Sequence, residues 1–280
     1  MSVLANKIDF AVVIGVKHAN PNGDPLNGNR PRTDYNGFGE ITDVCLKRKL
    51  RDRLQDAGHG IFVQSDDRKN DDAKSLRERA EKALGNKFGS AETVRLACAN
   101  WLDVRAFGQL FALPKKAKGK GGDEDGDTGV SIPIRGPVTL QSAFSVEPVE
   151  VTSTQITKSV NSDGDGSKRG ADTMGMKHRV DRGVYVFYGS MNPQLAERTG
   201  FSNEDAEAIK ASLPKLFEND ASSARPEGSM EVLKVVWWKH ASKAGQYSSA
   251  KVHRSLAVAA DGGIAVTPLE QLEAEIMDGF

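Results

Sequence analysis

The chain has 280 residues, with 38 Lys or Arg against 38 Asp or Glu, so its formal net charge is zero. That balance excludes a protein that coats nucleic acid through a strongly basic total charge. The sequence shows no signal pattern and no apolar run of membrane-spanning length, so we expect a cytoplasmic protein without a membrane partner.

The first predicted elements are a strand over residues 9–16 and a basic helix over residues 42–57, joined by a polar loop rich in Gly, Asn and Pro. One stripe of the helix, with the spacing that packs a helix onto a core, consists of Leu46, Leu50, Leu54 and Ala57. Lysines and arginines flank this stripe, and long cationic side chains can reach past a packing surface to a polyanion. The sequence therefore predicts a helix that docks through its leucines and binds phosphates through its cations.

Residues 58–136 are predicted to form an inserted helical or finger region. It contains a charged stretch at 65–82, an apolar helix at about 91–102 and a loop at 114–129 in which lysines precede aspartates. The loop is rich in glycine and in charge, a composition that predicts disorder.

A period-two strand is predicted over residues 138–146, and one of its faces would carry Val138, Leu140, Ser142, Phe144 and Val146. A second insertion, residues 150–181, is predicted to be a long hairpin with arms at 151–158 and 174–180. Its tip is polar and glycine-rich, which is untypical of a core. Five further elements are then expected: a strand at 183–188, a helix at 202–217, strands at 230–240 and 251–259, and a terminal helix from a capping box at 267–270 to residue 277.

Without the two insertions, the order of elements is strand, helix, strand, strand, helix, strand, which is the ferredoxin-like arrangement of RNA-recognition domains. The predicted fold class is α+β: a modified ferredoxin-like or RNA-recognition-motif (βαββαβ) palm with two large insertions, one of them the long hairpin. The palm would consist of residues 1–57, 137–149 and 182–280. A Rossmann-type fold is disfavoured because the glycine fingerprint is absent.

Signatures of phosphate loops, zinc proteases and serine hydrolases are absent, and the five histidines show no metal-ligand spacing. We therefore expect no cofactor, no metal and no catalytic residue. Residues 161–172 partly match a calcium loop, but both end ligands depart from the motif, which favours a hairpin tip. Asp24 and Asp34 flank the first loop's arginines and could serve a nuclease, although loop aspartates beside Gly and Pro usually form turns.

The aromatic residues of two strands are interpreted as core residues. Tyr185 and Phe187 are out of register with the base-stacking pattern of RNA-recognition domains, which favours packing over stacking. Trp237 and Trp238 are adjacent on one predicted strand and so point to opposite faces, and at least one of them is expected in the core.

Six segments, in this combination and order, resemble the backbone subunit of the type I-C CRISPR surveillance complex (Cascade), in the repeat-associated mysterious protein superfamily. Singly these motifs are weak, but together they span nearly the whole chain. They are His18–Pro25, Asn29–Asp34, Leu46–Arg51, Asp103–Gly108, Ile134–Gln141 and His178–Gly189.

The resemblance implies a hand-shaped protein whose copies stack along one CRISPR RNA. The first loop and the helix after it would hold the RNA backbone, through Asn20, Arg30, Arg32, Thr42, Lys47, Arg48 and Arg51. The long hairpin would be the thumb, with Met174 and Met176 as wedges between bases and Lys177 on a phosphate. Further RNA contacts are expected at Arg105, Arg135 and Gln141, which lie in the resembling segments.

Two functional hypotheses follow from this resemblance. The first is a non-catalytic scaffold that binds CRISPR RNA and presents guide bases to target DNA, with further copies of itself, the large and small subunits of Cascade and the RNA-processing subunit at the 5′ end as partners. The rival is a metal-dependent endoribonuclease of target RNA, of the kind found in type III backbone subunits, with Asp24 or Asp34 as its catalytic residue. The run Asn20–Asp24 favours the scaffold.

Overall fold

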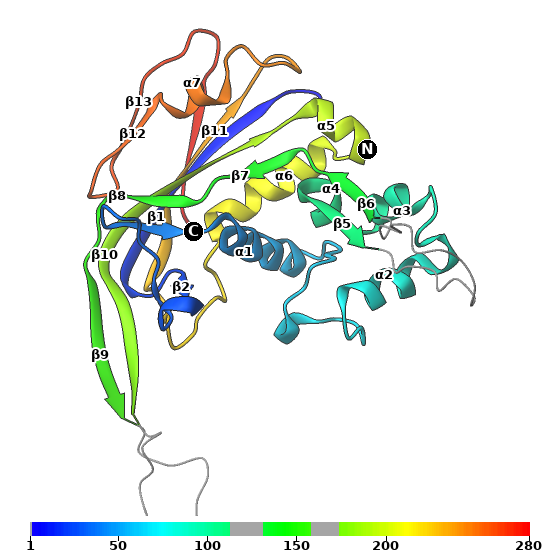
Figure 1. Cartoon of the computed structure of the whole chain (residues 1–280). Coiled ribbons are helices and arrows are strands. Elements are labelled where there is room, and N and C mark those ends of the chain that lie inside the picture. Colours follow the sequence, from blue (N-terminus) through cyan, green and yellow to red (C-terminus); the bar gives the residue numbers. More distant parts are fainter. Residues whose placement is uncertain (1, 113–130, 158–173) are drawn as a thin grey trace, which may run out of the picture.

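The computed structural model describes residues 2–112, 131–157 and 174–280, and one large antiparallel sheet organises them (Figure 1). The strand order is β14-β11-β1-β10-β8-β4, and β7 and β9 also pair with β10. The strands are β1 Ile8–Ala19, β4 Phe38–Ile41, β7 Val138–Leu140, β8 Ala143–Pro148, β9 Val151–Thr157, β10 Met174–Met191, β11 Met230–Lys239 and β14 Ala274–Asp278.

Helices α1 (Asp43–Asp56) and α6 (Asn203–Ser212) cover one face of the sheet, and α5 (Pro193–Thr199) precedes α6 (Figure 1). Thr42 caps the start of α1, and the leucine stripe predicted for this helix is confirmed because Leu46, Leu50 and Leu54 are buried in the main core. Ala57 is exposed just beyond the helix, so its place on the stripe was predicted wrongly. The last turn of the expected 202–217 helix is the 3-10 turn η5, Leu213–Lys215, because Pro214 cannot continue an α-helix.

A second group of elements covers the opposite face of the sheet: α7 (Ser249–His253), β12 (Leu256–Val258) and β13 (Ile264–Val266). Both tryptophans of β11 are buried, Trp237 in the core under the helices and Trp238 in the cluster under α7. The prediction of a strand at 251–259 is wrong over its first half, where the structure has the helix α7. The expected C-terminal helix is also wrong, because its second half is strand β14, paired with β11 from Lys234↔Asp278 to Trp238↔Ala274.

The structure has two strands where one was expected over residues 138–146. The alternation of buried and exposed side chains changes phase between them. Val138 and Leu140 of β7 are buried as predicted, but in β8 the buried side chains are those of Ala143 and Ser145, whereas Phe144 is exposed. A one-residue shift in a strand moves every following side chain to the other face. The two residues between β7 and β8 produce this shift, so the predicted face is wrong beyond Leu140.

The insertion after α1 has a small hydrophobic core of its own, built on Phe62, Trp101 and Phe111. The expected apolar helix at 91–102 is α3, and the charged stretch contains an additional helix, α2. The loop expected at 114–129 lies outside the described residues. The elements of this part are η2 Asp66–Arg68, α2 Leu76–Leu84, η3 Gly85–Lys87, α3 Thr93–Asn100, α4 Leu102–Phe107, β5 Gly108–Ala112 and β6 Ser131–Arg135.

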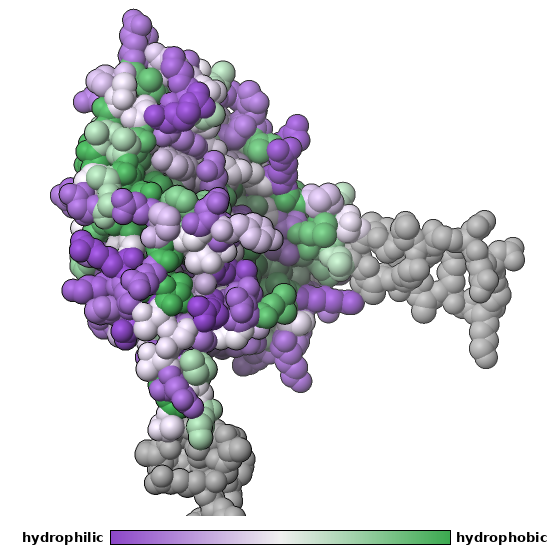
Figure 2. All heavy atoms as spheres, turned by 60° about the vertical axis from the view of Figure 1, so that its left-hand side comes forward, coloured by the Kyte–Doolittle hydropathy of each residue, from purple (hydrophilic) through white to green (hydrophobic). Residues whose placement is uncertain are grey.

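The predicted hairpin arms exist as β9 and the first part of β10, in register from Met174↔Thr157 to Val180↔Val151. They project away from the sheet, and their surface mixes hydrophobic and hydrophilic side chains (Figures 1 and 2). The same strand β10 continues into the centre of the sheet, where Tyr185 and Phe187 are core residues as predicted. The predicted tip and the calcium-like segment lie outside the described residues.

A fully buried carboxylate, that of Asp9 on β1, joins the sheet to the elements around α7. His240 Nε2 lies 2.9 Å from Asp9 Oδ2, Lys7 Nζ lies 3.2 Å from the same oxygen, and His253 Nε2 lies 3.6 Å from Oδ1. Burial raises the pKa of the Asp9 carboxyl, but the hydrogen bond with His240, the neighbouring His253 and Ser249 side chains and the charge of Lys7 together lower it by more, so the net pKa lies below the usual range. The ionised form is therefore preferentially stabilised in the folded protein.

We expect the stability of the fold to decrease as the pH falls below about 4, where an unfolded Asp takes up a proton. A carboxyl whose folded pKa is depressed contributes stability above its unfolded pKa and loses that contribution as the pH falls toward the folded pKa. Urea midpoints measured between about pH 5 and pH 3 check this. Asp9→Asn should have a shallower pH dependence than the wild type; parallel curves would contradict the role of Asp9.

Candidate nucleic-acid interface

The first loop is a fixed structure at the start of α1. Asn22 Oδ1 accepts hydrogen bonds from the Thr42 backbone N–H and from Thr42 Oγ1, both at 2.9 Å. Asn20 Nδ2 donates to the Asn29 carbonyl at 2.7 Å. Between Asn22 and Thr42, β2 (Gly23–Asp24) pairs with β3 (Arg30–Pro31) around the 3-10 turn η1, Pro25–Asn27. Of the predicted residues, Thr42 therefore joins the loop to the start of the helix, and Asn20 joins the two sides of the loop.

The two loop carboxylates are engaged in turns, as the sequence interpretation favoured. Asp24 Oδ1 accepts from the Leu26 amide at 3.2 Å and lies 3.4 Å from Arg32 Nη2. Asp34 Oδ1 accepts from the amides of Asn36 and Phe38, each at 2.9 Å. Within the residues that the structure describes, no group of three His, Cys, Asp or Glu side chains could hold a metal ion.

The cations of α1 are all paired with carboxylates of the protein itself. Lys47 Nζ lies 2.9 Å from Asp43, and Arg48 Nη1 lies 3.3 Å from Asp52 while donating to the Val63 carbonyl at 2.8 Å. The remaining pairs are Lys49 with Asp220, Arg51 with Asp103 and Arg53 with Asp56. The helix thus presents little unpaired charge, and RNA binding by Lys47, Arg48 and Arg51 stays a prediction.

The segment Asp103–Gly108 connects the insertion to the two large helices. The buried carboxylate of Asp103 accepts from Arg51 Nε at 2.9 Å and from the amides of Phe62 and Val63 at 2.7 and 3.0 Å. Arg105 makes a two-pronged ion pair with Asp205 of α6, at 2.8 and 2.7 Å. Arg51 and Arg105 therefore have a structural role, whatever else they bind.

Unpaired cations gather where the hairpin joins the sheet. Arg30 donates to Ser153 Oγ of β9 at 2.8 Å, which links the first loop to the hairpin. Lys177 is exposed on the hairpin, and Lys17 of β1 lies beside Arg182 of β10. Among the residues described, none of these four cations has a carboxylate within ion-pair distance. Neither Lys17 nor Arg182 was predicted from the sequence as a site residue, although Arg182 lies in the resembling segment His178–Gly189.

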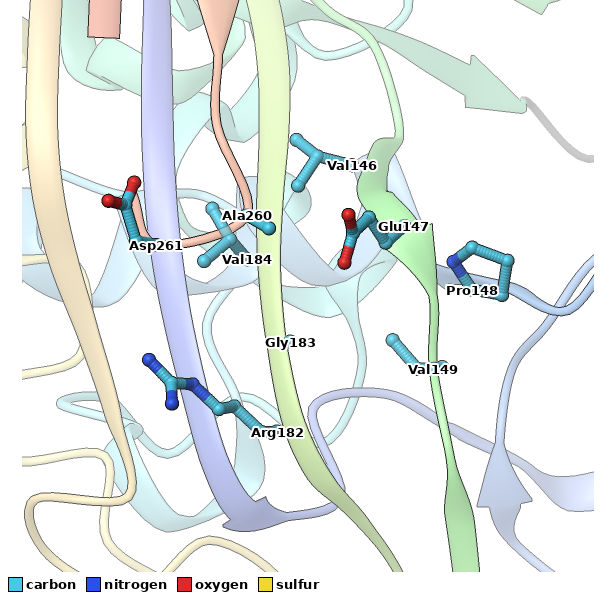
Figure 3. A pocket seen from close by; sticks show the side chains of 9 residues that line it. All are labelled: Val146, Glu147, Pro148, Val149, Arg182, Gly183, Val184, Ala260 and Asp261. Atoms are coloured by element: carbon cyan, nitrogen blue, oxygen red, sulfur yellow. The ribbon is translucent and has the colours of Figure 1, made fainter. Parts of the chain in front are cut away.

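Two adjacent hollows of about 430 and 280 Å³ share Arg182, Gly183, Val184 and Asp261, and Lys17 lines the smaller one. Figure 3 shows the larger one, with Arg182 reaching across β1 and the carboxylate of Glu147 on the β8 side. Carboxylates of Glu147 and Asp261 line the same surface as Arg182, so the hollows are mixed in charge. They do not form a purely cationic pocket.

The other predicted contacts lie on exposed positions. Met174 and Met176 are 60% and 55% exposed on the hairpin arm. Arg135 is exposed at the end of β6, and Gln141 is exposed between β7 and β8. The structure thus brings Arg30, Ser153 and the hairpin together. Arg105 and Arg135 belong to α4 and β6, and these elements of the insertion lie on the other side of α1 (Figure 1).

A model of one protein family, CRISPR-associated protein Cas7, matches residues 6–276. The chain belongs to the Cas7 family. It is 30% identical over 240 residues to the CRISPR-associated protein Cas7 of Haloferax volcanii, with 78% of this chain and 66% of that protein aligned. The chain thus spans just under two thirds of the length of this curated Cas7 relative.

Two solved structures resemble the Cas7 chain at low sequence identity. One belongs to a CRISPR RNA-guided surveillance complex in a pre-nicking state, with a TM-score of 0.47, 15% identity and coverage of 83% of this chain and 78% of that one. The other belongs to a CRISPR RNA-guided surveillance complex, with a TM-score of 0.42, 16% identity and coverage of 83% and 68%. No helix among the described residues is both long and apolar enough to cross a membrane.

Proposed function

We propose that this Cas7 chain is a non-catalytic backbone subunit of a type I-C Cascade complex. Copies of it would assemble along CRISPR RNA and present guide bases for pairing with target DNA. Its proposed partners are the RNA, neighbouring copies, the large and small subunits and the RNA-processing subunit at the 5′ end. The observation that carries this proposal is the match of the Cas7 family model to residues 6–276.

We infer that the centre of the sheet is a modified RNA-recognition fold. The chain order of the relevant elements is β1, α1, β8, β10, α6, β11, which is the βαββαβ order. In space the strands run β11-β1-β10-β8, with antiparallel pairing between neighbours. This order places the first and third strands in the middle, as in ferredoxin-like domains, and leaves the hairpin as an extension of the third strand.

The proposed mode of binding is through the RNA backbone, because a guide changes from one complex to the next and its bases must stay free to pair. The unpaired cations near the hairpin suit this role better than those of α1, which already neutralise carboxylates. A phosphate at Lys47 or Arg48 would have to compete with an existing ion pair. At Arg30 or Lys177 it would meet no such competitor in the described part of the chain.

We expect Arg30→Ala with Lys177→Ala to weaken binding of single-stranded RNA about equally for different guide sequences. The slope of log affinity against log salt should decrease by about 0.7 for each phosphate that the variant no longer neutralises. Fluorescence anisotropy over a salt series measures it. Lys239→Ala, which removes an exposed lysine at the far end of β11, is the matched control and should keep the wild-type slope. A defect confined to particular sequences would contradict backbone binding.

The proposed function is tested most directly by purifying the full chain from its host and sequencing the RNA that accompanies it. Spacer RNA flanked by repeat sequence is expected. Mixed cellular RNA, or no RNA, would overturn the assignment. Incubating the assembled complex with complementary RNA and a divalent metal tests the absence of catalysis, since cleavage lost in Asp24→Asn or Asp34→Asn would identify a nuclease instead.

A further inference from the structure

Tyr35 is the most exposed large hydrophobic side chain that the structure describes. Its exposure is 109% of the reference value, so its ring touches almost nothing else in the protein. It occupies the tip of the turn between β3 and β4, in the first loop. A single exposed aromatic is common on protein surfaces. A fixed backbone and an unpaired cation on the same segment, Arg30, distinguish this one.

The backbone under Tyr35 is held firmly. The Gly37 amide donates to the Asp34 carbonyl at 3.2 Å, which closes a β-turn, and Asp34 Oδ1 ties down two further amides of the same turn. Gly37 has a φ of +84°, a conformation that glycine adopts without strain. The Val149 amide donates to the Gly37 carbonyl at 2.9 Å and anchors the turn beside the start of the hairpin. A ring on such a support loses little conformational freedom when a ligand covers it.

The turn belongs to the same segment as Arg30, one of the unpaired cations described above. Arg30 is on the same β3–β4 segment and contacts the hairpin through Ser153. A fully extended chain from Arg30 to Tyr35 covers at most about 18 Å. The acidic group in the turn, Asp34, is already engaged as the acceptor of two backbone amides. The surface therefore combines a free aromatic face with a nearby guanidinium that can take a phosphate.

We propose that Tyr35 stacks on an unpaired base of a single-stranded RNA whose phosphates follow Arg30 and the base of the hairpin. Stacking suits a variable guide, because every base has a π-face and the interaction does not read base identity. This inference rests on the proposed RNA-binding function and adds a base contact to the backbone contacts.

The test uses the full chain and single-stranded RNAs that carry 2-aminopurine, placed at each position in turn. The RNA is kept too short to hold two copies of the protein, which removes contacts between copies. Tyr35→Ala is expected to bind on the order of tenfold more weakly and to lose quenching at one position, because removing an aromatic stacking partner weakens binding by that order. Tyr35→Phe should retain both affinity and quenching. Ile276→Ala, which removes an exposed apolar side chain from the opposite edge of the sheet, is the control.

The outcomes separate this inference from the proposed function. If the wild type fails to bind RNA, the proposed function itself is wrong. If the wild type binds and Tyr35→Ala matches it in affinity and quenching, only the stacking role is overturned. If Tyr35→Ala is defective solely on RNA long enough for several copies, the ring contacts a neighbouring protein, which also overturns it. Circular dichroism of Tyr35→Ala should match the wild type, because the ring contributes no packing.

Discussion

Replacing Asp103 with alanine is expected to destabilise the protein by about 3–5 kcal/mol, the range for removing one partner of a buried ion pair. Its carboxylate is 1% exposed and accepts hydrogen bonds from Arg51 and from two backbone amides of the insertion. The substitution leaves the largely buried Arg51 guanidinium and both amides without their acceptor. Unsatisfied buried donors are costly because they have already lost their hydration.

Denaturant unfolding of the full chain measures this effect, with Asp66→Ala as the control. Asp66 also pairs with a lysine, Lys69, but its side chain is 94% exposed, so water can replace the missing partner. The midpoint should shift strongly for Asp103→Ala and stay essentially unchanged for Asp66→Ala. Similar midpoints for the two variants would show that the buried pair does not hold the insertion. An RNA-binding defect in Arg51→Ala must be interpreted against this structural role.

Local patterns in the sequence were sufficient to predict most of the central elements. The stripe of α1 follows from helical periodicity and the start of α6 from its N-cap. The strands β1 and β11 follow from short runs rich in apolar residues. The arms of the hairpin were predicted by the same means, because a long polar interruption separates two extended segments. In each case the side chains that decide the structure are neighbours along the chain.

The wrong predictions occur where a distant partner decides the structure. The segment after Thr267 has a capping box and a proline, both of which favour a helix, yet residues 274–278 pair with β11. This pairing satisfies backbone groups of β11 that would otherwise lie at an open sheet edge. At β7 and β8 the alternation is continuous in the sequence, and only the pairing with β10 reveals the shift between Leu140 and Ala143.

The candidate site shows the same limit. The sequence places the cations on α1 correctly, but it does not show which carboxylates they meet. Arg51 pairs with a residue 52 positions away, and Arg105 with one 100 positions away. Only the fold reveals that the cations of α1 are paired with carboxylates. In the described part of the chain, four other cations have no carboxylate within ion-pair distance: Lys17, Arg30, Lys177 and Arg182. Charge in a sequence identifies candidates for phosphate binding, and the three-dimensional arrangement selects among them.

Removing the outer hairpin is expected to abolish ordered assembly on RNA while leaving the palm folded. Deletion of residues 157–176 joins Ile156 to Lys177, and Thr154 and Lys177 are partners in the hairpin register. The two residues left between them form a connection of hairpin-turn length, so Gln155→Asn with Ile156→Gly supplies the turn sequence that two-residue hairpins prefer. Among the described side chains that are removed or replaced, those of Met174, Met176 and Ile156 are exposed and lie outside the core.

Light scattering with and without guide RNA measures the assembly, and chemical probing of the guide measures the periodic exposure of single bases. The double variant Met174→Ala with Met176→Ala keeps the arm and removes only the proposed wedges. Because unbranched methionines can separate bases of any identity, this variant should still assemble but show weaker periodic exposure. The shortened protein should retain the wild-type circular dichroism and lose both properties. A wild-type periodic pattern from the shortened protein would show that the hairpin is not the thumb.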